Sequence, residues 1–272
     1  MVRGALGVLL KQLAPPEAFQ RIYQPSVSPG AGPSGLADLP RPFVLRAAHL
    51  DGVTLAPGAA FWIDTHVFDL KQPVLPYFAE AFARFATVGL GPERARVHLG
   101  TIEQLDLEDH AKPLASAPGV PCAISLDPEA EPVHSVAVRF VSPTELKSEG
   151  QLVDRPEFAI LFARVRDRIA TLQELYGGGP MALDFRGMGE RAAHVALTRC
   201  TLTWEKSSRR SSRTGQRHPL GGFLGEAEYQ GVLQEFLPWL RAARWTGVGR
   251  QTVWGKGDLR VMEARAANLR SL

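Results

Sequence analysis

Hydrophobic and polar residues in the second half of the chain alternate first with the period of a strand and then with that of a helix. Val136, Val138 and Phe140 alternate with polar or small residues, which predicts a half-buried strand. After Pro156, apolar residues recur at helical spacing until the glycine run at 177–179. This pattern predicts a long amphipathic helix after the first strand.

The rest of this half predicts two strands, a helix and a last strand. A β-branched run from His194 to Trp204 and a second run from Gly222 to Tyr229 indicate a hairpin with a long polar loop. Apolar positions within 233–240 form a further helix face, and Leu259 to Met262 are predicted as the final strand. The predicted order is βαββαβ, which is the ferredoxin-like unit.

The first half repeats most of this order without its opening strand. The predicted elements are a helix at Gly4–Leu13, strands at Arg41–Arg46 and Ala60–Phe68, a helix at Leu75–Phe85 and a strand at Arg94–Leu105. The expected fold is therefore α+β, with two tandem ferredoxin-like (RRM-like) halves of which the first lacks its opening strand. Either the reading frame starts too late or this half tolerates an incomplete sheet.

A proline-rich segment separates the two halves. Residues 111–132 contain five prolines and few apolar clusters, which is typical of an exposed linker. The predicted boundaries are 1–107 for the N-terminal half, 108–132 for the linker and 133–272 for the C-terminal half. A further stretch at 25–40 is rich in Gly, Pro and Ser and is expected to form a loop rather than core.

Composition limits the classes of function. The chain has 272 residues, of which 45% are hydrophobic, and 31 Lys and Arg face 28 Asp and Glu, so a site for a polyanion must come from local clustering of charge. Cys122 and Cys200 lie far apart, which fits a reducing compartment and argues against a disulfide scaffold or a zinc site. No targeting segment or membrane-length apolar stretch is evident, so we expect a cytoplasmic protein without a membrane partner.

Two segments have the composition of an anion-binding surface. Residues 247–257 contain two Gly-x-Gly pairs, and glycines allow a loop either to direct N–H groups at phosphates or to pack close to a neighbouring strand. A simple helix cap and turn is the alternative. Gly257 follows Lys256 where a P-loop needs Ser or Thr, so that motif is excluded.

The predicted hairpin loop at 206–218 is the most basic part of the sequence. It holds five Lys and Arg side chains and no acid, and its guanidinium groups suit phosphates of folded RNA. An ordinary solvated loop is the alternative. The arginines predicted to bind RNA are Arg209, Arg210, Arg213 and Arg217.

The chain resembles a known family along most of its length. The runs Gly221–Tyr229 and Phe236–Leu240, followed by the glycine segment, are similar to the C-terminal half of the CRISPR repeat-RNA endoribonucleases of the RAMP superfamily. The spacing G-x-G-x5-G-x-G resembles the glycine loop of that family, with Lys256 at a usually apolar place. Segments at 3–7, 41–45 and 89–91 resemble its first half.

The resemblance implies binding of the repeat in precursor CRISPR RNA and cleavage by a ribose 2′-hydroxyl, with no metal or other cofactor. RNA contacts are then expected at Gly247, Gly249, Arg250, Gly255, Lys256 and Gly257. Other CRISPR effector subunits are further candidate partners.

Family members often place a histidine near the first helix, but residues 1–48 contain none. By position and elimination, His49 is the candidate general base or acid, with Tyr23 as the alternative and Lys11 and Arg46 as helpers. An ordinary turn histidine is the competing interpretation of His49. A non-catalytic RAMP scaffold that holds CRISPR RNA in an effector complex is the alternative function.

Overall fold

The computed structural model describes residues 2–26, 39–91, 93–114, 120–206, 208–210, 217–219 and 221–262. The chain folds into two compact units, and each unit is built from segments that are not contiguous in sequence. The N-terminal unit comprises Met1–Phe43, Val67–Ile124 and Thr171–Pro180. The C-terminal unit comprises Val44–His66, Ser125–Ala170 and Met181–Leu272.

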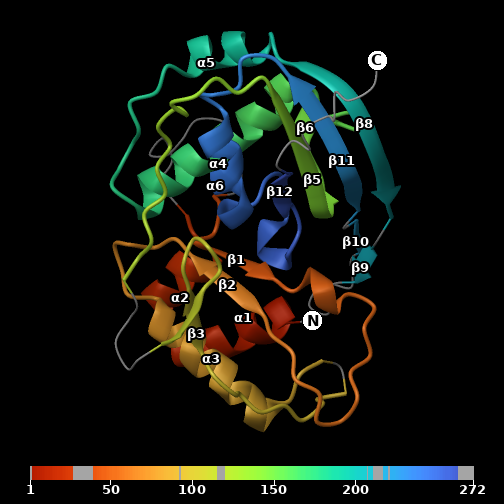
Figure 1. Ribbon diagram of the computed structural model, residues 1–272. Coiled ribbons are helices and arrows are strands. Elements are labelled where there is room, and N and C mark those ends of the chain that lie inside the picture. Colours follow the sequence, from red (N-terminus) through yellow and green to blue (C-terminus); the bar gives the residue numbers. More distant parts are fainter. Residues whose placement is uncertain are drawn as a thin grey trace. The chain divides into compact units, whose positions relative to one another are not determined.

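A four-stranded antiparallel sheet organises the C-terminal unit (Figure 1). Its strands are β5 (Ser135–Thr144), β8 (Ala196–Glu205), β11 (Gly222–Gln230) and β12 (Leu259–Met262), in the spatial order β12-β5-β11-β8. Val136, Val138 and Phe140 of β5 are buried, so the predicted alternation of the first strand is confirmed. The predicted hairpin is also confirmed, because β11 pairs antiparallel with β8.

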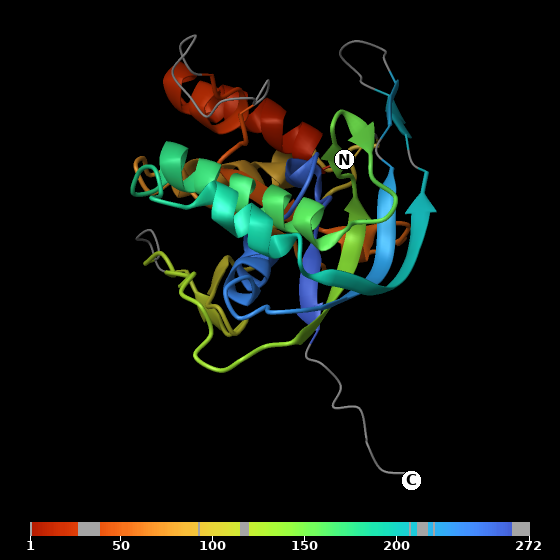
Figure 2. The same ribbon diagram turned by 90° about the horizontal axis from the view of Figure 1, so that it is seen from above.

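Helices α4 (Phe158–Tyr176) and α6 (Leu237–Thr246) lie on the same face of this sheet (Figure 1; Figure 2). Phe158 and Phe162 of α4 and Phe236, just before α6, join the buried side chains of the sheet in one core, where their rings meet edge to face. Aromatic rings bury the largest apolar areas, and this geometry adds to their attraction. The element order of the C-terminal unit is the predicted βαββαβ.

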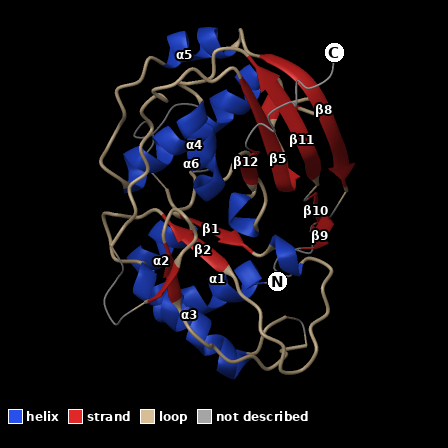
Figure 3. Ribbon diagram, in the orientation of Figure 1, coloured by secondary structure: helices blue, strands red, loops and turns tan. Residues whose placement is uncertain are grey.

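Several short elements of this unit were not predicted. They include α5 (Phe185–Ala192), which is seen in Figure 3, and the 3-10 helix η2 (Thr252–Trp254). The two-residue strands β6 (Lys147–Ser148) and β7 (Gln151–Leu152) also belong to this group and form a short hairpin after β5. Helix α5 contains two glycines, which disfavour helix, and it begins because the Asp184 carboxylate accepts a hydrogen bond of 2.9 Å from the Gly187 N–H.

The other helices and strands of the first half are α1 (Val2–Leu13), α2 (Pro16–Tyr23), β1 (Phe43–Arg46), β2 (Asp64–Val67) and α3 (Leu75–Val88), with a short 3-10 helix, η1, at Ala48–Leu50. They follow the predicted order except for α2 and η1, which were not predicted. Strands β1 and β2 form a two-stranded sheet. Leu6, Leu9 and Leu10 of α1 and Phe78 and Phe85 of α3 are buried.

The predicted strand at Arg94–Leu105 is wrong for most of its length. Only β3 (Glu103–Leu105) is a strand, and it pairs with β4 (Ala111–Pro113), which lies inside the predicted linker. Earlier in this run Ala95 makes a single bridge to Leu90, and Leu99 is largely exposed. A β-branched run forms a strand only where a neighbouring strand pairs with it, which a one-dimensional pattern does not reveal.

Most of the predicted loop at 25–40 falls outside the described residues. None of the described helices is long and apolar enough to cross a membrane.

Candidate nucleic-acid interface

The glycine segment after α6 is a close-packed loop. Gly247, Gly249, Gly255 and Gly257 all have positive φ, between 69° and 84°, a region in which side chains are disfavoured. A Cβ on Gly257 would lie 1.9 Å from the Val248 carbonyl oxygen, and one on Gly249 would lie 2.3 Å from the Glu145 carbonyl oxygen. The glycines therefore permit close approach of backbone to backbone, which was one of the two predicted uses of this loop.

Most of the loop's hydrogen-bond donors that the structure describes are used within the protein. The Val248 N–H donates to the Gly257 carbonyl at 2.9 Å, the Gly257 N–H to the Pro143 carbonyl at 3.1 Å, and the Arg250 N–H to the Glu145 carbonyl at 3.1 Å. The Gly247 N–H caps α6. In this conformation these groups hold the loop against the end of β5.

Below the loop lies a buried ion pair. The Arg46 guanidinium is 3.7 Å from the Asp258 carboxylate, and both side chains are almost fully buried. Arg46 also donates to the Arg244 carbonyl at 3.1 Å, near the end of α6. Burial lowers the pKa of Arg46 to about 10, and the negative charge of Asp258 acts against that shift. Arg46, considered above as a helper in catalysis, thus lies in the interior, where it links β1 to the glycine loop.

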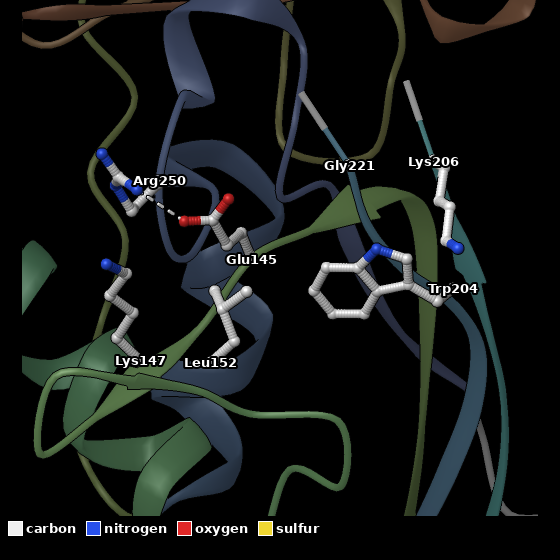
Figure 4. Close-up of a pocket in the computed structure, with 7 residues that line it drawn as sticks. All are labelled: Glu145, Lys147, Leu152, Trp204, Lys206, Gly221 and Arg250. Atoms are coloured by element: carbon white, nitrogen blue, oxygen red, sulfur yellow. Dashed lines mark hydrogen bonds and ion pairs between the residues drawn. The ribbon is translucent and has the colours of Figure 1, made fainter. Parts of the chain in front are cut away.

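An open pocket of about 340 Å³ lies beside the loop (Figure 4). Its lining combines an exposed aromatic ring, three cationic side chains and one acid. The lining residues are Glu145, Lys147, Leu152, Trp204, Lys206, Gly221 and Arg250. The acid is paired, because the Arg250 guanidinium lies 2.7 Å from the buried Glu145 carboxylate, so the free charge at this pocket is positive.

Among these lining residues, sequence reasoning singled out Arg250 in the glycine segment and Lys206 as part of the basic loop. Trp204 was placed in a strand without a function, and an exposed aromatic on the sheet was not expected. The only signal was its position immediately before the basic segment. Trp204 has the same parity along β8 as Cys200 and Leu202, which pack against the core, so the pattern alone predicts a buried ring.

The basic segment is a strand hairpin at its base. Strands β9 (Ser208–Arg210) and β10 (Arg217–Pro219) pair antiparallel, with Arg210 opposite Arg217. This register places both residues at the same level of the ladder. Arg213 lies outside the described residues.

His49 lies on η1 with its ring exposed. Its Nε2 is 3.1 Å from the Trp62 carbonyl oxygen, and its ring stacks on the Trp62 indole with centroids 4.3 Å apart. A carbonyl oxygen only accepts hydrogen bonds, so Nε2 carries the hydrogen. In the neutral ring Nδ1 is therefore the basic atom, and the tryptophan fixes the orientation of the ring.

Tyr23 ends α2 in the N-terminal unit, whereas His49 belongs to the C-terminal unit. Its hydroxyl donates to the Arg3 carbonyl at 2.8 Å, and the guanidinium groups of Arg3 and Arg41 lie 4.8 Å and 5.8 Å from its ring centroid. A Cβ on Gly7 would lie 2.4 Å from the phenol. The phenol is thus held among cations, and its proton is already used in a hydrogen bond to the backbone. Lys11, the other helper named above, is exposed on α1.

One cluster in the described residues has metal-ligand chemistry. Oxygen and nitrogen atoms of Asp106, Glu108 and His110 lie within 4.8 Å of one another beside the turn between β3 and β4. Asp106 accepts hydrogen bonds from the backbone N–H groups of Glu108 and His110 and lies 3.1 Å from the His110 ring nitrogen. These contacts explain the cluster as a turn, and nothing else in its surroundings points to a ligand.

Comparison with known families identifies the class of protein. Residues 138–259, which run from β5 to β12, match the family model of the CRISPR-associated endoribonuclease Cas6. A second model, described only as an N-terminal domain, matches residues 1–120. Residues 138–259 thus form a domain of the Cas6 endoribonuclease type, as the resemblance in sequence implied. No curated protein matches the chain closely enough to count as a relative.

Solved structures share the fold. A Cas6 of Thermus thermophilus in a product complex aligns with a TM-score of 0.61 at 18% identity, over 96% of this chain and 92% of that chain. Another structure of this Thermus thermophilus Cas6 aligns with a TM-score of 0.50 at 18% identity, over 96% of this chain and 89% of that chain. Both alignments extend over nearly the whole sequence, and they support a mixed α+β architecture of the Cas6 type.

Proposed function

We propose that this endoribonuclease processes precursor CRISPR RNA by binding the repeat and cleaving it without a metal ion. The observation that carries the proposal is the family match over residues 138–259 of the C-terminal unit. In this unit one pocket beside the glycine loop is lined by three cationic side chains, Lys147, Lys206 and Arg250. The 2′-oxygen at the cut site attacks the adjacent phosphorus and the bond to the 5′-oxygen breaks. The products are a cyclic phosphate and a 5′-hydroxyl.

His49 is the proposed proton-transfer residue. Its Nδ1 accepts the proton of the 2′-hydroxyl, because Nε2 is held as a donor to the Trp62 carbonyl. If His49 is the general acid instead, the protonated ring donates from Nδ1 to the leaving 5′-oxygen. In-line attack places the two oxygens on opposite sides of the phosphorus, so Nδ1 serves one of them and water exchanges the other proton. Stacking on Trp62 fixes the plane of the imidazole ring. Tyr23 is the alternative, and it must first give up its hydrogen bond to Arg3.

Side chains rather than loop N–H groups make the proposed contacts of the glycine segment with RNA. Arg250 and Lys256 extend from it, and Gly247, Gly249, Gly255 and Gly257 contribute by allowing the close packing that positions these two residues. The arginines of the basic hairpin, Arg209, Arg210, Arg213 and Arg217, bind phosphates of the repeat. Every one of these contacts is electrostatic, so affinity is expected to fall with salt.

We also infer the finer architecture of two tandem ferredoxin-like halves, with boundaries at 1–107, 108–132 and 133–272 and the first half lacking its opening strand. The strand order of the C-terminal sheet is the ferredoxin-like order, which supports the inference for that half. Cytoplasmic location and assembly with other CRISPR effector subunits belong to the same proposal.

Cleavage of repeat RNA in EDTA tests the proposal. We expect one cut in the repeat, and we expect His49→Ala to slow single-turnover cleavage by about 10²- to 10⁴-fold at nearly unchanged RNA affinity. His194→Ala is the matched control, because His194 is also exposed and also has a ring nitrogen near a backbone carbonyl, at 2.9 Å from the Glu190 oxygen.

Three outcomes separate the alternatives. If Tyr23→Phe shows the larger loss, Tyr23 is the proton-transfer residue instead of His49. Cutting that requires a divalent cation would contradict the metal-free mechanism. Retention of repeat RNA without any cut would favour the non-catalytic scaffold.

A further inference from the structure

Trp204, at the end of β8, presents an aromatic ring at the open pocket. Its side chain remains 38% exposed, although Cys200 and Leu202 on the same face of the strand pack against the core. Large aromatic side chains usually gain stability from burial, so an exposed tryptophan at a pocket is a candidate ligand contact. None of the contacts described so far uses this ring.

The ring is held in position from one side. Trp204 pairs across the ladder with the fully buried Phe223, and their ring centroids are 6.5 Å apart. A Cβ on Gly221 would lie 3.1 Å from the indole Nε1 and 2.7 Å from the Glu205 carbonyl oxygen. Glycine at 221 therefore lets the indole lie close against the backbone, and the ring is oriented before any ligand arrives.

The pocket around the Trp204 ring is lined by positively charged side chains. In Figure 4 Lys206 lies on one side of the indole, and Lys147 and Arg250 lie across the pocket from it. Arg250 already pairs with Glu145, so the two lysines are the cations most available to a ligand. A flat apolar ring between cations matches a nucleotide, whose base stacks on the ring while its phosphates meet the ammonium groups.

We propose that Trp204 stacks an unpaired base of the bound RNA, with Lys147 and Lys206 contacting the phosphates beside that base. The inference rests on the proposed function and adds a binding subsite to it. The base is unpaired because a base inside a helix is covered on both faces, whereas a single-stranded or bulged base has a face to offer. Lys206 is two residues before the first residue of β9, so the subsite lies next to the basic hairpin in the sequence.

The test combines protein variants with abasic RNA. Affinity is measured for the repeat transcript of the same genome, carrying a 2′-deoxy sugar at the mapped cut site, or unmodified if no cut occurs. Trp204→Ala is expected to weaken binding by about 10- to 100-fold, the size of one base stack, and Trp204→Phe to restore much of it. Phe185→Ala, an exposed aromatic of α5 outside the pocket, is the matched control.

Abasic substitution at each position in turn identifies the stacked base. For wild-type protein one position should weaken binding strongly, and for Trp204→Ala the same abasic RNA should bind no worse than intact RNA. This loss of sensitivity distinguishes stacking from a structural role of the tryptophan, which would weaken binding of all RNAs alike. Two results would overturn the subsite. One is that Trp204→Ala binds intact RNA as tightly as wild type does. The other is that Trp204→Ala weakens the binding of intact RNA and of every abasic RNA by the same factor.

Photo-crosslinking of wild-type protein to the same RNA provides a readout that does not depend on the folding of a variant. We expect the crosslinked peptide to contain Trp204, and crosslinks confined to other peptides would contradict the proposal. Failure of the proposed function has a different signature, namely no binding or cutting of the repeat by wild type. Binding and cutting that are both insensitive to Trp204 would reject this subsite alone.

Discussion

His49 and His66 belong to the same compact unit and have opposite surroundings. His49 is exposed, whereas His66 on β2 is partly buried, with its Nδ1 2.8 Å from the Trp245 carbonyl oxygen and its ring tilted against the Trp245 indole. Burial, together with the positive charge of Arg46, lowers the pKa of His66 to about 4. His66 is therefore neutral at neutral pH and contributes to packing.

This shift predicts a dependence of stability on pH. Unfolded His66 has an ordinary pKa near 6.5 and takes up a proton in acid before the folded residue does, so protonation favours the unfolded chain. The contribution of His66 to the free energy of unfolding should be complete above about pH 6.5 and fall as the pH approaches 4, by at most about 1.4 kcal/mol per pH unit. Denaturant titrations between these values measure it.

His66→Gln keeps a donor for the Trp245 carbonyl but does not titrate, so it should flatten this part of the pH profile. His194→Gln, at an exposed position, is the control. An unchanged slope in His66→Gln would show that other groups, such as carboxylates, cause the dependence.

Trp204 shows why single functional residues were missed. The alternation along β8 places Trp204 on the core-facing side of the strand, and this placement is correct. The ring is not buried, however, because it contacts Phe223 on one side and lines the open pocket on the other. Period alone cannot show where along a strand the covering helices end. The opposite case is Arg46, a charged residue at the end of a strand, which is buried because Asp258 pairs with it from a segment more than 200 positions away.

At the scale of elements, local patterns predicted most helices and strands of the C-terminal unit. Strand β5, helix α4, the β8–β11 hairpin and helix α6 each carry a clear period and a clear stop signal. The pattern failed where a strand depends on pairing with a distant segment. The run at 94–105 has strand-like residues, but only its last three residues pair with β4. The glycine loop was located correctly, and the choice between its two predicted uses required the carbonyl groups that it packs against.

The prediction at the scale of elements concerns RNA binding by the basic hairpin. Replacing Arg209, Arg210, Arg213 and Arg217 by alanine should weaken repeat binding and reduce the slope of log K against log salt by roughly 3, at about 0.7 to 0.9 per lost phosphate contact. Filter binding over a range of salt concentrations measures this slope.

The control replaces four arginines of the same unit that are each paired with a carboxylate: Arg155, Arg186, Arg191 and Arg241. Both variants lose the same formal charge, so a non-specific effect of net charge would lower both slopes equally. That result would contradict a specific role of the hairpin.

At the scale of the whole molecule, the two compact units do not coincide with two contiguous halves of the sequence. The C-terminal unit includes Val44–His66, which a division at residues 108–132 assigns to the other half. Val44 and Leu45 of this segment are buried, and Arg46 neutralises Asp258. The pattern of elements predicts the order βαββαβ but not that a segment from the first half completes the unit.

This arrangement predicts the behaviour of a fragment. Residues 133–272 produced alone lack Arg46 and the two apolar neighbours, so Asp258 loses a partner beneath the glycine loop. We expect the fragment to unfold at a lower temperature than the same unit in the full chain. In the full chain, Arg46→Met should cost at most about 3 kcal/mol of unfolding free energy, because it removes one of the two arginines, Arg46 and Arg260, beside the buried Asp258 carboxylate. Adding Asp258→Asn should recover part of that cost, since the buried charge is then gone. Thermal unfolding followed by circular dichroism and urea titrations test both expectations. A fragment as stable as the full chain would show that 133–272 is a self-sufficient domain and that the segment at 44–66 is dispensable for its fold.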